Sequence, residues 1–239
     1  MGGFLQLAGV RAGYGGGDIL QSLDLSVEEG SLTCIVGPNG AGKSTVLRVI
    51  SGLLRPSAGT VLFRGESIAG RSPRAILGRG IVQVPQERSL FPTMSVWENV
   101  RLGAFTVHDR GLVAKRLATV CETFPIVAER RHELAASLSG GQQKIVEFAR
   151  ALMLDPALLI LDEPSMGLDP KTRSLVFNTV REMNRAGRTL LLVEQNARSG
   201  LGIATHGVVM ESGRVRLEGP GPEVLNNPEI GRLYLGATI

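Results

Sequence analysis

The sequence predicts an α/β fold around a parallel sheet, and three apolar runs support this class. Residues 158–161 and 190–193 are continuous apolar runs, each followed by an acidic residue, as in central strands buried on both faces. Residues 31–36 form a third run, which leads through glycines into a helical pattern. Alternating strands and helices place ligands at the carboxyl ends of the strands, so these three ends form the candidate site.

The first part of the chain predicts a second, mainly antiparallel sheet. Residues 4–7, 19–27 and 59–63 have strand-like composition, and a glycine-rich loop containing Tyr14 joins the first two. Short runs bounded by glycines are typical of strands joined by tight connections. We expect this small sheet to flank the loop that follows residues 31–36.

That loop has the spacing Gly-x-x-x-x-Gly-Lys-Ser. It consists of Gly37, Pro38, Asn39, Gly40, Ala41, Gly42, Lys43, Ser44 and Thr45. Glycines let backbone N–H groups turn inward around anionic oxygens, and a helix N-terminus adds a favourable dipole. We expect Lys43 to reach the β- and γ-phosphates of a nucleotide and Ser44 to place its hydroxyl on Mg²⁺. The alternative is a chance glycine turn, against which the preceding strand and the following helix, residues 45–50, both argue.

Residues 80–84 predict another strand, and the helical patterns after it predict an all-helical insert. Ser95 and Glu98 have the spacing of a capping box at the start of a helix. Helical patterning continues to about residue 137, with breaks expected at Gly111 and Pro125. The insert therefore separates two strands of the core.

Residues 141–154 predict a helix with one buried face, because apolar residues recur at spacings of three and four. These are Ile145, Phe148, Ala149, Leu152 and Met153.

Asp162 and Glu163 then close the next apolar strand. Asp162 suits a carboxylate that orients Mg²⁺ and its water, and Glu163 one that activates or orients an attacking water; a surface pair of acids is the alternative. Residues 207–217 predict a β-hairpin with a two-residue turn.

Length and composition fit one domain that stays in the compartment where it is made. The 239 residues are 43% hydrophobic but only 4% aromatic, which predicts one aliphatic core. No run approaches the roughly 18 apolar residues of a membrane span, and the N-terminus lacks a secretion signal. Cys34 and Cys121 lack metal-site spacing and are expected to be buried thiols. The net charge is +4, with basic residues scattered singly, so we expect no nucleic-acid partner.

The motifs occur in the order of the ATP-binding-cassette superfamily. After the phosphate loop come Gln86, the signature Leu138-Ser139-Gly140-Gly141-Gln142, the acidic pair and Asp169. The chain resembles this superfamily over essentially its whole length, and the signature is highly specific. The resemblance implies an ATP-hydrolysing, RecA-like P-loop NTPase core with an N-terminal antiparallel β subdomain and an inserted α-helical subdomain. Within a single domain, residues 1–86 and 138–239 would form the core with the β subdomain, and residues 87–137 the helical subdomain.

The resemblance also implies roles for individual residues. Tyr14 resembles the aromatic residue that stacks on adenine, although a lone Tyr in a glycine loop is also typical of a plain surface residue. Gln86 resembles the glutamine that reaches Mg²⁺ and links the site to the helical insert. Ser139, Gly140, Gly141 and Gln142 resemble the signature that presents a hydroxyl and helix-terminal amides to a γ-phosphate.

In this superfamily that γ-phosphate belongs to the nucleotide of a second ATPase chain. The resemblance therefore implies a head-to-tail pair, either of two copies or with a sister ATPase, with Asp169 at the seam. It further implies ATP and Mg²⁺ as cofactors, two transmembrane permease subunits and, indirectly, an extracytoplasmic solute-binding protein. The chain would then lie peripherally on the cytoplasmic face of the cell membrane.

One position departs from the superfamily pattern. A histidine is expected after residues 190–194, and Gln195 stands there; glutamine donates a hydrogen bond to phosphate but carries no charge. Residues 194–196, with residues 164–170 and the tail through Tyr234, Leu235 and Gly236, resemble the second ATPase of branched-chain amino acid importers. The alternatives are urea or amide uptake, export of lipid or lipopolysaccharide, and a DNA-repair ATPase. Exporters usually retain the histidine, and the repair proteins carry long inserts that this chain lacks.

Overall fold

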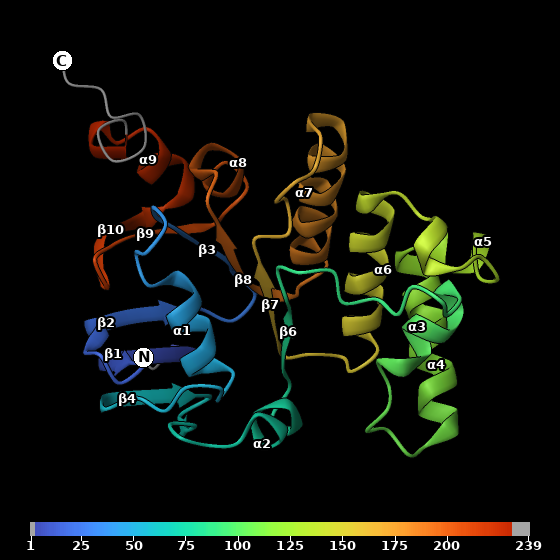
Figure 1. The fold of residues 1–239 in the computed structure, drawn as a ribbon, viewed down its shortest axis with the longest axis horizontal. Helices are drawn as coiled ribbons and strands as arrows, with labels where there is room; N and C mark the ends of the chain where they lie inside the picture. The colour runs from blue at the N-terminus through green and yellow to red at the C-terminus, as the bar shows by residue number, and fades with distance from the viewer. Residues whose placement is uncertain (1–2, 231–239) are drawn as a thin grey trace.

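The structure, a computed structural model, describes residues 3–230, which form two sheets with helices around them (Figure 1). The larger sheet has six strands in the order β10-β9-β3-β8-β7-β6. They are β3 (Leu32–Val36), β6 (Ile81–Val84), β7 (Leu158–Asp162), β8 (Thr189–Glu194), β9 (His206–Glu211) and β10 (Arg214–Pro220). All neighbours pair in parallel except β10, which is antiparallel to β9. The predicted α/β class is confirmed.

Successive side chains of the central strands belong alternately to two hydrophobic cores, one on each face of the large sheet. In β8, Leu190 and Leu192 belong to one core, and Leu191 and Val193 belong to the other. Because both faces are covered, the strand reads as a continuous apolar run. Cys34 of β3 is buried as expected, whereas the expectation is wrong for Cys121, which is only partly buried.

The smaller sheet is antiparallel, with strands in the order β2-β1-β4-β5. These strands are β1 (Leu5–Gly13), β2 (Asp18–Val27), β4 (Ala58–Phe63) and β5 (Glu66–Ser67). Their apolar residues and those of α1 (Lys43–Ile50) share one core. The small antiparallel sheet expected beside the phosphate loop is therefore confirmed.

The chain between β6 and β7 is helical, as predicted. It contains α3 (Val96–Leu102), α4 (Arg110–Thr123), α5 (Ile126–Glu129), the 3-10 helix η1 (Ala135–Ser137) and α6 (Gly140–Leu152). Ser95 caps α3 in the expected capping box with Glu98. The break predicted at Gly111 is wrong: Asp109 caps α4 and accepts the N–H of Gly111, which lies in the first turn. Pro125 does interrupt the pattern, as the N-cap of α5.

The remaining helices are α2 (Pro73–Gly78), α7 (Pro170–Arg185), α8 (Ala197–Leu201) and α9 (Gly221–Leu225). α6 packs against α3 on one side and α7 on the other, so it joins the helical insert to the sheet (Figure 1). Ser212 and Gly213 turn the β9–β10 hairpin with φ of 48° and 77°. Positive φ at both positions is what a type I′ turn requires, and the predicted hairpin is confirmed.

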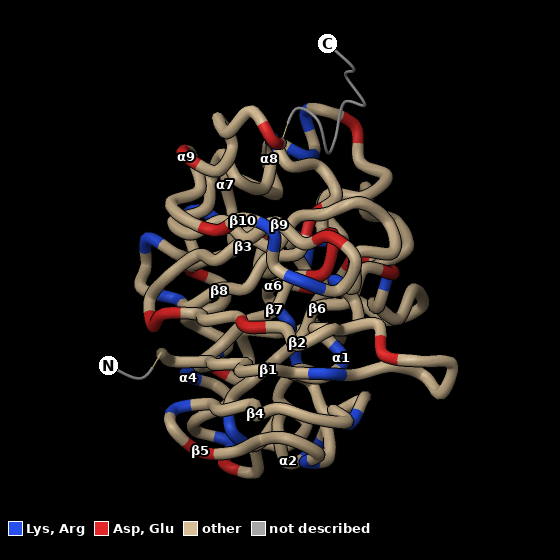
Figure 2. Tube along the Cα trace, turned by 90° about the vertical axis from the view of Figure 1, so that its left-hand side faces the viewer, with Lys and Arg blue, Asp and Glu red and all other residues tan. Residues whose placement is uncertain are grey.

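Two further features concern the surface. No helix among residues 3–230 is both long and apolar enough to cross a membrane. On the side of the molecule that carries the small sheet, Lys and Arg are interspersed with Asp and Glu (Figure 2). The tail residues Tyr234, Leu235 and Gly236, which entered the sequence comparison, lie outside the described residues.

Candidate active site

Four loops that carry candidate residues meet at one edge of the large sheet. Because β3, β6, β7 and β8 run parallel, their carboxyl ends lie together. These ends lead into Gly37, Gln86, Glu163 and Gln195. A cavity of about 330 Å³ opens there and is lined by Ile19, Asn39, Gly40, Ala41, Gly42, Lys43, Ser44, Thr45, Gln86, Glu163, Met166 and Gln195. The structure thus brings together the phosphate loop and three of the residues expected to act on phosphate.

The phosphate loop runs directly into helix α1. Gly42 is the N-cap of α1 with φ of 101°, and a Cβ at this position would lie 3.0 Å from Leu20 Cδ2. Glycine is therefore the residue that this turn accepts. Within the described residues no side chain caps α1, so its first N–H groups and the positive end of its dipole face the cavity and suit an anion.

Lys43 lies between the loop and the acidic residue Glu163. Its Nζ donates to the carbonyls of Gly37 at 2.7 Å and Pro38 at 3.2 Å, and it lies 3.8 Å from Glu163 Oε1. The residue is only 5% exposed, and burial lowers its pKa while Glu163 opposes that shift. A flexible cation held at the cavity wall can exchange these carbonyls for phosphate oxygens.

Glu163 occupies a backbone conformation that is uncommon for its residue type. Its φ is +42°, and such left-handed positions are found where surrounding structure holds them. The Glu163 N–H donates to the carbonyl of Val193 in β8 at 2.9 Å. Gln86 Nε2 donates to Glu163 Oε2 at 3.3 Å and to Met166 Sδ at 2.7 Å. The carboxylate is thus fixed at the cavity wall between Lys43 and Gln86.

Asp162 lies beside this cavity without lining it. The residue is half-buried; burial is the main cause that raises its pKa, Glu163 adds to the rise, and Lys43 opposes it. Ser44 and Gln86 do line the cavity, and Gln86 engages Glu163 through its amide nitrogen, so its carbonyl oxygen is available to a cation. Hydroxyl, amide and carboxylate oxygens are the hard ligands that Mg²⁺ prefers. The donor set therefore fits Mg²⁺, with Ser44 and Gln86 at the cavity and Asp162 beside it.

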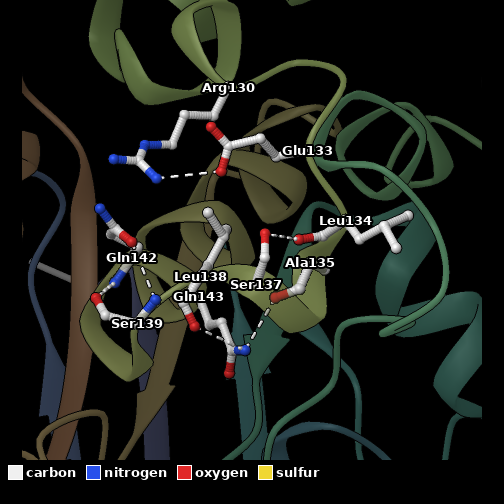
Figure 3. A network of polar contacts seen from close by, with 9 residues as sticks. All are labelled: Arg130, Glu133, Leu134, Ala135, Ser137, Leu138, Ser139, Gln142 and Gln143. Atoms are coloured by element: carbon white, nitrogen blue, oxygen red, sulfur yellow. Dashed lines mark hydrogen bonds and ion pairs between the residues drawn. The ribbon is translucent and has the colours of Figure 1, made fainter.

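The signature opens helix α6 and lies outside the phosphate cavity. Ser139 Oγ accepts the N–H of Gln142 at 3.4 Å, and Gln142 Oε1 accepts the N–H of Ser139 at 3.0 Å (Figure 3). Gln143 Nε2 donates to the carbonyls of Ala135 and Leu138, which anchors this helix start to η1. Ser139 is exposed and is not among the residues that line the cavity.

The two signature glycines make close contacts with the segment around the start of α7. A Cβ on Gly141 would lie 2.2 Å from Thr172 Cγ2, and one on Gly140 would lie 3.3 Å from Leu168 Cδ2. Asp169 is the N-cap of α7, and hydrogen bonds from Thr172 hold its pKa below the usual value. Asp169, the residue expected at the seam between two chains, therefore lies in a segment that packs against the signature.

Tyr14 lies in the loop between β1 and β2. Its hydroxyl accepts a hydrogen bond from Arg48 at 2.9 Å, and the Arg48 guanidinium lies 5.3 Å from the ring centroid. Arg48 belongs to α1, the helix that follows the phosphate loop. The ring is 51% exposed and does not line the phosphate cavity, so stacking on adenine stays a prediction.

A second, largely apolar cavity of about 500 Å³ lies between β6 and helices α3 and α6. Its walls are Leu77, Val82, Gln83, Val84, Pro85, Phe91, Leu102, Gly103, Phe105, Glu147, Arg150, Ala151 and Leu154. Phe91 is 52% exposed and Phe105 is 70% exposed. Exposed apolar surfaces of this kind are typical of sites that bind protein, membrane or ligand. We call it the apolar groove.

The segment that links Gln86 to the apolar groove is fixed to α6. Ser89 donates its N–H at 2.6 Å and its hydroxyl at 3.0 Å to Glu147 Oε1, and Arg150 donates to the Ser89 carbonyl at 2.7 Å. Glu147 also pairs with Lys144 at 2.6 Å. The sequence analysis assigned no role to these residues. The available signal was the presence of charged residues on the face of α6 that packs inward.

Sequence reasoning also assigned no role to Glu194, the last residue of β8. Glu194 is 2% exposed and its Oε1 accepts the N–H of Ser165 at 3.2 Å. Ile19 and Met166, which line the phosphate cavity, were missed as well. The available signal for Glu194 was an acidic residue at the end of an apolar strand, directly before Gln195. An apolar wall residue such as Ile19 gives no signal of its own.

Comparison with known proteins places this site in a family. A sequence profile described as ABC transporter matches residues 20–166. The high-affinity branched-chain amino acid transport ATP-binding protein BraG of Pseudomonas aeruginosa is 36% identical over 93% of this chain and 95% of its own length. The Nod factor export ATP-binding protein I of Cupriavidus metallidurans is 38% identical over 95% of this chain and 74% of its own length.

Solved structures agree with these relatives. The ADP conformation of MJ1267, an ATP-binding cassette of an ABC transporter, has a TM-score of 0.88 at 30% identity and covers 98% of this chain and 99% of that one. The dimeric post-hydrolysis state of the cassette MJ0796, bound to ADP and Pi, has a TM-score of 0.76 at 25% identity and covers 90% of this chain and 98% of that one. With the phosphate loop, the acidic strand end and the signature in place, the chain belongs to the ABC transporter family as one of its ATP-hydrolysing subunits.

Proposed function

We propose that this ATPase drives uptake of branched-chain or related amino acids through separate membrane subunits. The observation that carries the proposal is the match to BraG, which spans nearly the full length of both chains. Gln195, at the position where a histidine is usual, supports the same importer subfamily.

In the proposed reaction the residues of the phosphate cavity have separate tasks. Lys43 and the first N–H groups of α1 hold the phosphates, and Glu163 orients or activates the attacking water. Gln195 donates a hydrogen bond to the γ-phosphate. Gln86 links the site to the helical insert, so that a change at the phosphates moves the segment that follows it. Mg²⁺, held by Ser44 and Gln86 with Asp162 contacting its waters, would supply charge neutralisation on the β- and γ-phosphates.

The site would be completed by a second ATPase chain. Ser139, Gly140, Gly141 and Gln142 lie outside the phosphate cavity of their own chain, and Ser139 is exposed at the start of α6. An exposed helix N-terminus is a ready anion site, which a partner's γ-phosphate would occupy in a head-to-tail pair. Asp169 would lie at that seam, and Tyr14 would stack on adenine. The dimeric form of MJ0796 supports this arrangement.

The apolar groove is the proposed contact with the permease subunits. It lies beside the segment that begins at Gln86, so a partner bound there would act directly on the phosphate cavity. It also lies between residues 87–137, the proposed helical subdomain, and the core formed by residues 1–86 and 138–239. Binding to permease subunits would hold the chain on the cytoplasmic face of the cell membrane, with a solute-binding protein acting on the far side.

Transport by the purified complex tests the solute class. The chain, its permeases and the solute-binding protein would be placed in vesicles, and ATP-dependent accumulation of leucine, isoleucine and valine would be compared with that of urea and acetamide. We expect accumulation of at least one branched-chain amino acid with the unmodified chain and none with Glu163→Gln. Accumulation of urea or acetamide alone would assign the chain to the amide-uptake branch.

Export is a second candidate, because an export ATPase is 38% identical to this chain. The match leaves about a quarter of that exporter uncovered, since the chain covers 74% of it. The same vesicles decide between the two directions. Hydrolysis that is unaffected by amino acids, together with ATP-driven movement of a lipid-linked saccharide in the outward sense, would favour export.

A further inference from the structure

The turn that carries Glu163 is attached at two points to the end of β8. At its first residue, the Glu163 N–H donates to the Val193 carbonyl at 2.9 Å. Two residues later, the Ser165 N–H donates to Glu194 Oε1 at 3.2 Å. The turn between these points contains the left-handed Glu163, with φ of +42°, so its geometry depends on both attachments. The residue after Glu194 is Gln195, which lines the phosphate cavity with Glu163.

Glu194 is built into this place rather than exposed beside it. The residue is 2% exposed, and a Cβ on Gly200 of α8 would lie 3.2 Å from Glu194 Cβ, so the helix packs closely over the side chain. Glu194, Glu163, Ser165 and Gln195 also line a common cavity of about 350 Å³. A buried carboxyl needs hydrogen-bond partners. On the neighbouring loop, the partner of Glu194 is the N–H of Ser165, which belongs to the turn that carries Glu163.

We propose that Glu194 is a positioning residue for ATP hydrolysis, which holds the turn of Glu163 in register with Gln195 through its hydrogen bond to Ser165. The proposal rests on the proposed role of Glu163 as the residue that orients water. Glu194 does not touch the nucleotide; it acts on the two residues that do. A displacement of about 1 Å in such a group lowers a rate by up to about 100-fold, which sets the size of the expected effect.

Shortening the side chain separates this role from simple packing. Glu194→Asp keeps the carboxyl group but withdraws it from Ser165, whereas Glu194→Gln keeps an oxygen that accepts the Ser165 N–H. We expect Glu194→Asp to lower kcat for ATP about 10- to 100-fold with KM changed less than about 3-fold, and Glu194→Gln to retain kcat within about 3-fold. Glu194→Ala should behave as Glu194→Asp wherever it folds. The assays use the full chain with Mg²⁺ and ATP, assembled with its partner subunits.

Hydrogen exchange at the Ser165 amide distinguishes a local loss of this hydrogen bond from a general loss of stability. The Ser165 amide should exchange at least 10-fold faster in Glu194→Asp than in the unmodified chain, and at an unchanged rate in Glu194→Gln. Glu211→Asp is the matched control, because Glu211 also ends a strand of the same sheet, β9, but within the described residues its carboxylate accepts no hydrogen bond from the Glu163 turn. Its kcat should stay unchanged.

Two outcomes would overturn the inference, and each is distinct from failure of the proposed function. If Glu194→Asp retained kcat within 3-fold while Glu163→Gln stalled hydrolysis, Glu194 would have no positioning role and the site assignment would stand. Equal losses of kcat in Glu194→Asp and Glu194→Gln would likewise reject the hydrogen bond as the cause. Normal turnover by Glu163→Gln would instead reject the proposed role of Glu163.

Discussion

Four charged or amide side chains that line the phosphate cavity lie within two residues of the end of a parallel strand or begin the helix after one. Lys43 begins α1, Gln86 lies two residues after β6, Glu163 directly follows β7 and Gln195 directly follows β8. The backbone therefore determines their spacing, and the side chains need few additional contacts to meet. Lys43 and Glu163, 3.8 Å apart, form the pair between which a γ-phosphate would lie.

Replacing Lys43 by alanine should weaken ATP binding strongly. Hydrogen bonds from a charged donor contribute about 1.5–3 kcal/mol, so Lys43→Ala should raise the Kd for ATP about 10- to 150-fold, measured by calorimetric titration with Mg²⁺ present. Lys115→Ala is the control, since Lys115 is an exposed lysine of α4. A Kd for Lys43→Ala within 2-fold of that of the control would show that the lysine does not bind phosphate.

The buried carboxyl of Glu194 makes stability depend on pH. Burial is the main cause that raises its pKa from 4.5 to about 7, against the opposing hydrogen bond from Ser165. The folded chain thus holds this proton more tightly than the unfolded chain, so the contribution to stability is complete below pH 4.5 and is lost as pH rises to about 7. The free energy of unfolding of the unmodified chain, minus that of Glu194→Gln, should fall by up to about 3 kcal/mol across this window. Urea unfolding of both proteins at pH 5 and pH 7.5 measures the change, and a constant difference would contradict it.

Among the elements, α6 connects the two functional surfaces. Its N-terminus presents the signature, and its inward face holds Ser89 through Glu147 and Arg150, beside the apolar groove. Its start also packs on α7, where Gly141 lies against Thr172. A movement of the segment after Gln86 would therefore be carried to the signature by a single helix.

Gly141 should be required for packing independently of any ligand. Its Cβ would lie 2.2 Å from Thr172 Cγ2, so Gly141→Ala should lower the free energy of unfolding by about 1–3 kcal/mol. Thr172→Ser removes that methyl group and keeps the hydroxyl, so the double variant should recover most of the loss. Urea unfolding of the two single variants and the double variant measures the coupling. Additive losses would show that this contact is not the reason for the glycine.

The elements that the sequence predicted best were those with local signals. The apolar runs of β7 and β8 and the Ser95–Glu98 capping box needed only neighbouring residues, and all three are confirmed. The break at Gly111 was wrong because glycine alone was weighed, whereas Asp109, two positions earlier, caps a helix that contains Gly111 in its first turn. The signature was found by its motif, but its separation from the phosphate cavity depends on tertiary packing. Local patterns could not show it.

Over the whole molecule, the segment from Pro85 to Phe91 connects the phosphate cavity, which Gln86 lines, to the apolar groove, which Pro85 and Phe91 line. The polar cavity contains the phosphate loop, and the apolar groove exposes Phe91 and Phe105. ATP hydrolysis at one and permease contact at the other would thus be separated by a few residues fixed to α6. This proximity is the physical basis of the proposed coupling.

Charging the apolar groove should separate assembly from ATP binding. Phe105 is 70% exposed, so Phe105→Asp should change the free energy of unfolding by less than about 0.5 kcal/mol and leave the Kd for ATP unchanged. Co-purification with the permease subunits should nevertheless fall at least 10-fold. Leu175→Asp, which charges an exposed position on α7, should retain full assembly. Equal retention by both variants would exclude the groove as the permease contact.

In the proposed pair of chains, ATP is held between the phosphate loop of one chain and the signature of another. Ser139→Asp tests it most directly, because aspartate caps α6 as well as serine does but places a negative charge against the partner's γ-phosphate. The experiment uses a Glu163→Gln background, with Mg²⁺ and ATP, and measures sedimentation of the chain with its pairing partner. The unmodified signature and the control Ser139→Asn should both give a stable dimer. Ser139→Asp should give monomers, although each chain still binds ATP. A dimer of unchanged stability with Ser139→Asp would contradict the shared site.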